Sequence, residues 1–198
     1  YSFDGGTRLP SYQGDGTSGL YIWGAQLEEQ SYATSYIKTE GTTVTRNADV
    51  VTGAGTSDTF NDSEGVFYAE MSRQEGNVSS TALSINNGAL SNSIIIYYFG
   101  TNNFYFDIFS GVATVTAGAN LDTSNLNKIA LKYKSGDISV YINGSEVITK
   151  TDAISLSGLS QINFDYGDTS SPFYGNVKDI RVYNTALTDA ELIELTTI

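Results

Sequence analysis

The amino-acid sequence predicts an all-β protein, built as a sandwich of two antiparallel sheets with one short helix at its C-terminal end. Three observations lead to this prediction. Short segments in which apolar and polar residues alternate recur along the chain, which is the pattern of half-buried strands. Twenty glycines against two prolines suit tight turns between such strands. A helical pattern occurs only near the C-terminus, from residue 188 onwards.

Residues 1–40 are interpreted as an N-terminal arm or linker, and residues 41–198 as one domain. Within the arm, residues 20–27 are an apolar strand candidate that contains Trp23, the only tryptophan. We interpret this segment as a remnant strand of a preceding β-domain. Its apolar side chains then need cover from the following domain or from a neighbouring subunit.

Strand candidates follow one another through the domain, and the chain as a whole is expected to hold roughly eleven strands. The clearest pair spans residues 127–135 and 137–149. In the second of these segments, Asn143 and Gly144 predict a type I′ hairpin turn, since both residues of that turn need a positive φ. The other strand candidates of the domain are residues 44–51, 65–72, 80–86, 93–100, 103–111, 111–118, 160–167 and 176–183.

The last of these strand candidates carries an irregular apolar pattern. Ile180 and Val182 alternate with polar residues, but Val177 precedes Ile180 by three positions rather than two or four. Both apolar groups can face the core only if the strand contains an extra residue. The pattern therefore predicts a β-bulge at residues 178–179.

A short helix is predicted to follow this strand. Thr188 and Glu191 have the spacing of a capping box, in which two otherwise free backbone donors are satisfied. Leu192 and Leu195 lie on one face of the helix. That face is expected to rest on the sheet.

Three segments resemble two kinds of known protein. The pattern G-x-V-x-D-I-R-V-Y-N-x-A-L-T-D-A-E-L, within residues 173–198, resembles the end of laminin-G-like, concanavalin A-like jelly rolls, and ALKYKSGDISVYINGSEV resembles their central hairpin. The run LYIWGAQLEEQSYATSYIKTEGTTVTRNADVV, residues 20–51, is similar to a linker of phage virion proteins, especially tail and fibre proteins. The first resemblance implies a concanavalin A-like jelly-roll sandwich. The second implies a place on the virion surface.

Composition narrows the choice of partner and chemistry. Ten lysines and arginines against 22 aspartates and glutamates give a formal charge of −12, which makes nucleic acid and anionic membranes poor partners. The acidity either serves solubility or supplies calcium ligands at one or two acidic loops. The chain contains neither cysteine nor histidine, which excludes disulfides, thiolate nucleophiles, imidazole metal sites and Ser-His-Asp catalysis. The sequence also shows no apolar stretch long enough for membrane insertion.

The strand candidates within residues 94–109 carry the main candidates for carbohydrate binding. Tyr97 and Phe99 share one face of the first strand, and Tyr105 and Asp107 share one face of the second. Aromatic rings stack on the C–H faces of sugars, and carboxylate oxygens pair with sugar hydroxyls. The alternative is that these aromatic residues form the core and ordinary cross-strand pairs.

Asp165, Tyr166 and Asp168 lie where a predicted strand meets a loop, and they join the candidate binding residues. Asp165 and Asp168 could also bind calcium, the one cofactor that the sequence suggests, or they could form ordinary turn hydrogen bonds. The resemblance adds Asp179 as a third calcium candidate, because lectin-like relatives often carry an acidic residue at this position. Its neighbour Lys178 favours pairing with a lysine or arginine instead.

The resemblance also includes enzymes, since glycoside hydrolases and alginate lyases share this sandwich. The related hydrolases carry an E-x-D-x-x-E or E-x-D-x-E pattern on one strand, and the related lyases use a Gln-x-His element. The sequence contains neither pattern. Inverting hydrolysis by two carboxylates from different strands stays open, but a non-catalytic protein is expected.

The sequence therefore predicts a non-catalytic, lectin-like carbohydrate-binding module of a phage virion or tail protein. Its expected partners are a glycan on a host surface and other virion subunits, with a homotrimer as the expected assembly. Repeated copies on the particle would multiply weak individual binding. One alternative is a structural virion or fibre module without a ligand. The other is a carbohydrate-binding module of a secreted bacterial enzyme.

Overall fold

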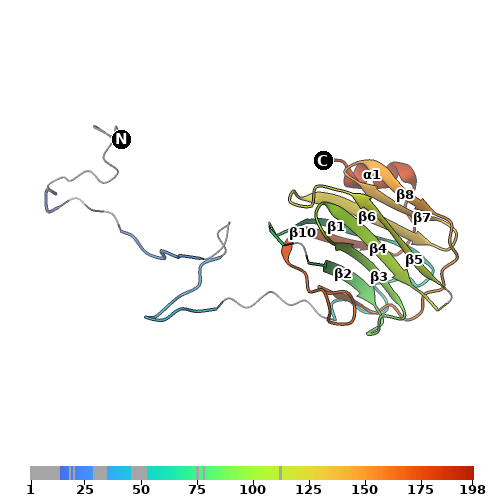
Figure 1. The fold of residues 1–198 in the computed structure, drawn as a ribbon, viewed down its shortest axis with the longest axis horizontal. Helices are drawn as coiled ribbons and strands as arrows, with labels where there is room; N and C mark the ends of the chain where they lie inside the picture. The colour runs from blue at the N-terminus through green and yellow to red at the C-terminus, as the bar shows by residue number, and fades with distance from the viewer. Residues whose placement is uncertain are drawn as a thin grey trace. The chain divides into compact units, whose positions relative to one another are not determined.

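The computed structural model contains two compact units, residues 1–48 and residues 49–198. In the second unit two layers of strands face each other (Figure 1). The residues that the structure describes are 14–17, 19, 21–28, 35–45, 53–74, 76–77, 79–111 and 113–198.

The described part of the first unit contains no strand. The strand predicted at residues 20–27 is wrong for its described part, residues 21–27, which lacks strand pairing. Trp23 is 82% exposed and packs edge-on against Tyr36, with 5.5 Å between the ring centroids. Among the described residues of the first unit, this is the one ring contact that the segment makes. The strand predicted at residues 44–51 lies largely outside the described residues.

The described residues of the second unit form ten strands in two five-stranded sheets. The first sheet has the order β10-β1-β6-β7-β8, and the second has the order β5-β4-β3-β2-β9. Neighbouring strands within both sheets are antiparallel, which confirms the predicted sandwich. The strands are β1 (Glu64–Arg73), β2 (Thr81–Asn86), β3 (Ser93–Tyr98), β4 (Asn103–Phe109), β5 (Thr114–Asn120), β6 (Asn127–Lys134), β7 (Ile138–Ile142), β8 (Ser145–Lys150), β9 (Gln161–Asn163) and β10 (Gly175–Tyr183).

The hydrophobic core lies between the two sheets and follows the alternation of the sequence. Along β4, Phe104, Phe106 and Ile108 are fully buried in this core. Burial of side chains of this size contributes about 1.5–3 kcal/mol each. Because successive side chains of a strand point to opposite faces, Tyr105 and Asp107 lie on the outer face of the second sheet, as predicted.

The predicted bulge in the last strand is confirmed. Val177 and Asp179 lie opposite consecutive residues of β1, so Lys178 is an extra residue without a partner there. The extra residue shifts the alternation by one position. As a result, Val177 and Ile180 both pack against the core, although they are three positions apart.

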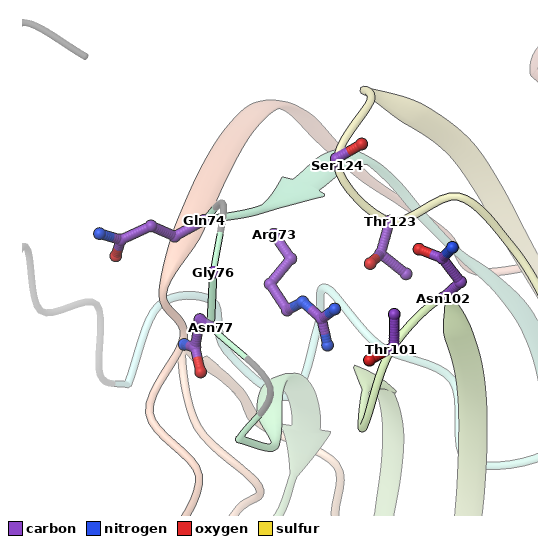
Figure 2. Close-up of a pocket in the computed structure, with 8 residues that line it drawn as sticks. All are labelled: Arg73, Gln74, Gly76, Asn77, Thr101, Asn102, Thr123 and Ser124. Carbon is purple, nitrogen blue, oxygen red and sulfur yellow. The ribbon is translucent and has the colours of Figure 1, made fainter. Parts of the chain in front are cut away.

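Arg73, the last residue of β1, connects the two sheets at one rim of the sandwich. Its backbone amide donates to the carbonyl of Thr123 at 2.7 Å, and its guanidinium donates to the carbonyl of Gly100 in the turn between β3 and β4. In the same turn, the carbonyl of Asn102 accepts the amide of Leu121 at 2.9 Å. These bonds surround a cavity of about 190 Å³ beside the Arg73 side chain (Figure 2).

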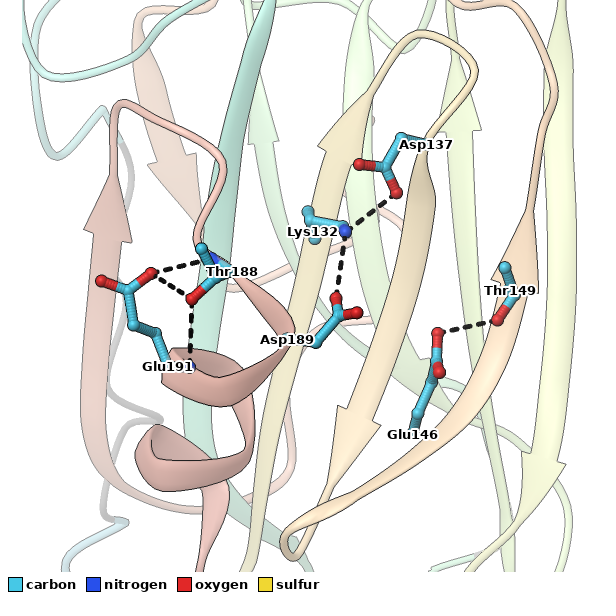
Figure 3. Close-up of polar contacts among 7 residues, drawn as sticks. All are labelled: Lys132, Asp137, Glu146, Thr149, Thr188, Asp189 and Glu191. Carbon is cyan, nitrogen blue, oxygen red and sulfur yellow. Dashed lines mark hydrogen bonds and ion pairs between the residues drawn. The ribbon is translucent and has the colours of Figure 1, made fainter.

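The helix α1 (Asp189–Thr196) packs on the outer face of the first sheet and carries the predicted capping box (Figure 3). The Thr188 amide donates to the Glu191 carboxylate at 2.8 Å, and the Glu191 amide donates back to the Thr188 hydroxyl at 3.4 Å. Leu192 is fully buried and Leu195 packs beside it, as predicted. Across the described residues, no helix has the length and apolar character that crossing a membrane requires.

Lys132 of β6 is a buried cation on the same face of the first sheet. Its ammonium lies 2.8 Å from a carboxylate oxygen of Asp137 and 3.5 Å from one of Asp189 (Figure 3). The side chain is 7% exposed, so these carboxylates compensate a charge that has lost its hydration. The pairing also ties the first residue of α1 to the sheet.

Candidate functional site

The outer face of the second sheet carries a row of aromatic side chains. The strand register places Gly118, Tyr105, Tyr97 and Ala82 side by side across β5, β4, β3 and β2. The rings of Tyr97 and Tyr105 stack, with 5.4 Å between their centroids and 22° between their planes. A Cβ at Gly118 would collide with the Tyr105 ring. Glycine at this position therefore lets the ring lie against the β5 backbone.

The next row across the same face is centred on Asp107. The register aligns Thr116, Asp107, Ile95 and Ser84 on β5, β4, β3 and β2. Thr116 at the β5 side is exposed, whereas Asp107 is 3% exposed and Ser84 is fully buried. The β5 side of this sheet face is therefore open to solvent, whereas the β2 side is covered.

The cover comes from the segment that joins β9 to β10, residues 164–174, called the covering loop below. The strand predicted over residues 160–167 ends at residue 163, because the chain leaves the sheet edge and crosses the outer face of β2. The carbonyl of Ser171 accepts the amide of Ala82 at 3.2 Å. The hydroxyl of Thr81 accepts the amide of Tyr174 at 2.5 Å. Backbone bonds thus fix the loop on the sheet.

Gly167 is the point at which the covering loop lies close to the sheet. It has a φ of +92°, and a Cβ there would lie 3.4 Å from Nδ2 of Asn86 and 3.5 Å from Oγ of Ser84. Asp165 is 8% exposed, and its Oδ1 accepts the Gly167 amide at 2.6 Å. This Asp165 carboxylate therefore helps to shape the covering loop.

Tyr166 extends from the covering loop onto the aromatic row. Its hydroxyl donates a hydrogen bond to Oδ2 of Asp107, and its ring meets Tyr97 edge-on at a centroid distance of 5.4 Å. The other oxygen of this carboxylate, Oδ1, is buried and has no hydrogen-bond partner among the described residues. We call Tyr97, Tyr105, Tyr166 and Asp107 the tyrosine cluster.

The environment keeps two hydroxyls of the cluster protonated. Burial, reinforced by the negative charge of Asp107, raises the pKa of Tyr97 well above its ordinary value. Burial and the hydrogen bond to Asp107 raise the pKa of Tyr166 in the same way. At neutral pH both groups are therefore neutral phenols that can donate hydrogen bonds.

This arrangement has the chemistry of a sugar-binding surface. The three rings are half-buried, so each is held in place and still reaches the surface. Aromatic rings offer flat apolar faces for sugar C–H groups, and phenol hydroxyls and a carboxylate offer hydrogen-bond partners for sugar hydroxyls. The exposed Thr116 adds a hydroxyl at the edge of the Asp107 row.

The structure brings together four of the seven predicted binding residues. Phe99 follows the end of β3, is 54% exposed and takes part in none of the ring contacts among the described residues. Asp165 lies in the covering loop beside Tyr166, but its carboxylate is engaged with Gly167. Asp168 is an exposed turn residue whose Oδ1 accepts the amide of Ser170 at 3.0 Å.

The three predicted calcium ligands are not gathered at one place. Asp165 and Asp168 lie in the covering loop, whereas Asp179 belongs to β10 of the first sheet. The Asp179 carboxylate lies 2.7 Å from the guanidinium of Arg181, which is the pairing that the sequence offered as the alternative. Within the described part of the chain, no three acidic side chains are grouped in a way that could hold a metal ion.

Sequence reasoning missed three features of this region. Gly118 could have been found, because a glycine inside a strand pattern marks a close approach of another group. The covering loop could not have been found, because nothing in its sequence reveals that it crosses a sheet face. Arg73 at the rim received no role, because it directly follows the strand candidate of residues 65–72, where a charged residue is ordinary.

Comparison with known proteins identifies the fold. The family model described as the concanavalin A-like lectin/glucanases superfamily, Laminin_G_3, matches residues 58–193, which is more than half of the chain. No curated protein matches the sequence.

Several solved structures have the same fold at low sequence identity. The carbohydrate-binding module CBM40 of a Ruminococcus gnavus IT-sialidase, bound to α2,3-sialyllactose, has a TM-score of 0.62 and 19% identity, over 76% of this chain and 96% of that chain. Domain 4 of AbnA, an extracellular arabinanase of Geobacillus stearothermophilus, in complex with arabinotriose, has a TM-score of 0.55 and 17% identity, over 72% and 70% of the two chains. A leech intramolecular trans-sialidase has a TM-score of 0.59 and 21% identity, over 76% of this chain and 27% of that chain.

Proposed function

The chain belongs to the concanavalin A-like lectin/glucanases superfamily, and we propose that within this superfamily it is a non-catalytic carbohydrate-binding module. The sugar binds at the tyrosine cluster on the outer face of the second sheet. One observation carries the proposal. Three half-buried tyrosine rings surround a buried carboxylate, Asp107, one of whose oxygens lacks a hydrogen-bond partner among the described residues.

The ligands of the similar structures support this proposal. The Ruminococcus gnavus module is bound to sialyllactose and the arabinanase domain to arabinotriose, and both ligands are oligosaccharides. Fold alone does not determine function, so the proposal depends mainly on the side chains of this protein. Its tyrosine cluster supplies the flat rings and the polar groups that an oligosaccharide needs.

The arrangement of carboxylates supports a binding role rather than hydrolysis. Glycosidases of the two common mechanisms place two carboxyl groups on either side of the bond that is cut. The tyrosine cluster contains one carboxylate, Asp107, and its Oδ2 accepts the Tyr166 hydroxyl. The neighbouring Asp165 is engaged with the amide of Gly167 inside the covering loop.

The biological setting of the proposal is the surface of a phage particle. It rests on the resemblance of residues 20–51 to linkers of phage tail and fibre proteins. In this setting the module contacts a glycan on the host surface, and other virion subunits, arranged as a homotrimer, repeat the weak site and raise the avidity.

A specific observation favours a second kind of protein to which a module with the same site could belong. Similar structures include a binding module of a bacterial sialidase and a domain of an extracellular bacterial arabinanase. The chain would then be a carbohydrate-binding module of a secreted bacterial enzyme. Both settings place the site outside a cell and leave its chemistry unchanged.

A glycan array tests the proposal. The purified chain is screened once with calcium and once with a chelator, and we expect selective binding to a subset of glycans. Loss of binding in chelator alone would add Asp165 and Asp168 as calcium ligands. No binding to any glycan, together with a stable trimer in solution, would overturn the proposal in favour of a structural virion module.

A further inference from the structure

The cavity at the rim of the sandwich is separate from the tyrosine cluster and has a different chemistry. It is formed by the end of β1, the turn between β3 and β4, and the connection from β5 to β6. Its volume of about 190 Å³ is small, since pockets for drug-sized ligands measure roughly 300–1,000 Å³. Its principal lining residues are Arg73, Asn77, Thr101, Asn102, Thr123 and Ser124.

Arg73 is the charged group of this cavity. The residue is 7% exposed, and its guanidinium lies between Asn77 on one side and Thr101 and Thr123 on the other (Figure 2). A guanidinium has five N–H donors in a planar fork. Among the described residues, the Arg73 side chain donates one hydrogen bond, to the carbonyl of Gly100.

Four other basic groups of the sandwich are paired with carboxylates; Lys128 and Lys150 are not, but they are half-buried, whereas Arg73 is buried. Lys132, Lys134, Lys178 and Arg181 each form an ion pair. Arg73 forms none with the residues that the structure describes. A cation is rarely buried without a negative partner, because it loses hydration that only another charge or several hydrogen bonds can replace.

The cavity walls are held in place before any ligand binds. The amide of Arg73 is bonded to the carbonyl of Thr123, and the carbonyl of Asn102 is bonded to the amide of Leu121. Asn102 has a φ of 55°, a left-handed conformation that asparagine adopts more readily than most residues. Such pre-organisation lowers the entropy that binding must overcome.

These observations indicate the chemical class of the ligand. A planar guanidinium fork matches a carboxylate in two parallel hydrogen bonds. The amide and hydroxyl groups around it suit the hydroxyls of a sugar ring. The charge of −12 on the whole chain repels anions, so only an anion that makes close contacts in the cavity would overcome this repulsion.

We infer that the Arg73 cavity is a second saccharide subsite, which binds the carboxylate of one acidic sugar residue. This inference rests on the proposed function, because it takes the ligand to be a glycan. Arg73 binds the carboxylate, and the side chains of Asn77 and Thr101 contact hydroxyls of the same sugar residue. The tyrosine cluster binds a different part of the glycan.

The test titrates the wild-type chain with glucuronic acid or N-acetylneuraminic acid, followed by NMR of the arginine side chains and of the backbone amides. The neutral counterparts are their methyl esters, and acetate serves as the carboxylate without a sugar. Salt is kept at about 150 mM, where charges further away than about 8 Å are largely screened. We expect the signals of Arg73 and Thr101 to shift with the acids and to stay in place with the esters.

Variants then assign the site. Arg73→Gln should weaken binding of the acidic sugar on the order of 10- to 100-fold, the usual effect of losing a charged hydrogen-bond partner. Arg73→Lys keeps the positive charge but lacks the planar N–H donors of the guanidinium. This second variant is measured in case Arg73→Gln fails to fold. Arg181→Gln, at an exposed arginine of the first sheet, is the matched control and should leave binding unchanged.

The outcomes separate this inference from the proposed function. Loss of acidic-sugar binding in Tyr105→Ala but not in Arg73→Gln would overturn the inference and place the acid at the tyrosine cluster. Equal binding of the acids and their methyl esters, or of acetate and the acids, would also overturn it. Failure of all glycans to bind the tyrosine cluster, while acids still shift Arg73, would overturn the proposed function and leave the cavity as a carboxylate site.

Discussion

The hydrogen bond between Tyr166 and Asp107 should make a large contribution to stability, and Tyr166→Phe tests it. The hydroxyl of Tyr166 donates to Oδ2 of Asp107, and Oδ1 has no partner among the described residues. Asp107 is 3% exposed, so solvent does not replace the lost donor. An unsatisfied buried acceptor costs about 1–3 kcal/mol, and more when it is charged, so we expect a loss of about 2–3 kcal/mol.

The measurement is urea and thermal unfolding of the variant beside wild type. For a chain of this length each kcal/mol lowers Tm by about 2–4 °C, so the expected decrease is about 4–12 °C. Tyr105→Phe is the matched control, because it removes a hydroxyl of the same sheet face that forms no hydrogen bond with the described residues. It should change stability by less than about 0.5 kcal/mol.

A double-mutant cycle identifies the partner. Combining Tyr166→Phe with Asp107→Asn should give less than the sum of the two single effects, with a coupling energy of about 0.5–3 kcal/mol. If Tyr166→Phe were as mild as Tyr105→Phe, the covering loop would not be fixed to Asp107 in solution. The Tyr166 ring would then not be held in place before a sugar binds.

Three further predictions concern pH, the helix and the sheet face. Burial is the main cause that raises the pKa of three tyrosines to about 12, and these are Tyr68, Tyr133 and Tyr141. In the unfolded chain these phenols ionise near pH 10, so the free energy of unfolding should fall between about pH 10 and 12, by up to about 1.4 kcal/mol per pH unit for each tyrosine. Urea titrations at several pH values measure this fall. A free energy of unfolding that stays constant over this range would contradict the burial of these tyrosines. Thr188→Ala removes the helix cap and should cost about 1 kcal/mol in urea unfolding, whereas no change would mean that the capping box is not formed. Gly118→Ala should destabilise by about 1–3 kcal/mol and weaken glycan binding in calorimetry, since its Cβ displaces the Tyr105 ring, and unchanged values for both would refute this packing.

The strands and the helix could be predicted from the sequence because their signals are local. The alternation in β4 correctly assigned Tyr105 and Asp107 to the outer face. The irregular spacing of Val177 and Ile180 correctly predicted a bulge, and the spacing of Thr188 and Glu191 correctly predicted the cap. Each of these inferences needs only the geometry of one element and its neighbour.

The organisation of the site could be predicted only in part, because it depends on long-range packing. The sequence named Tyr97, Tyr105, Asp107 and Tyr166, but it did not reveal that the covering loop brings Tyr166 over a strand that lies 59 positions earlier in the chain. The resemblance also grouped Asp179 with two aspartates of the covering loop, although Asp179 lies in β10 of the first sheet. Arg73 gave no signal, since its cavity forms from three separate connections.

The most direct test of the central claim is the affinity of the tyrosine cluster for the glycan selected on the array, measured by calorimetry. Wild type is compared with Tyr105→Ala and with Tyr174→Ala, which removes a 44% exposed tyrosine outside the cluster. We expect Tyr105→Ala to bind about 10-fold weaker or more, the loss typical of a central contact residue, and Tyr174→Ala to match wild type. Equal affinities for all three proteins would contradict a carbohydrate site at the tyrosine cluster.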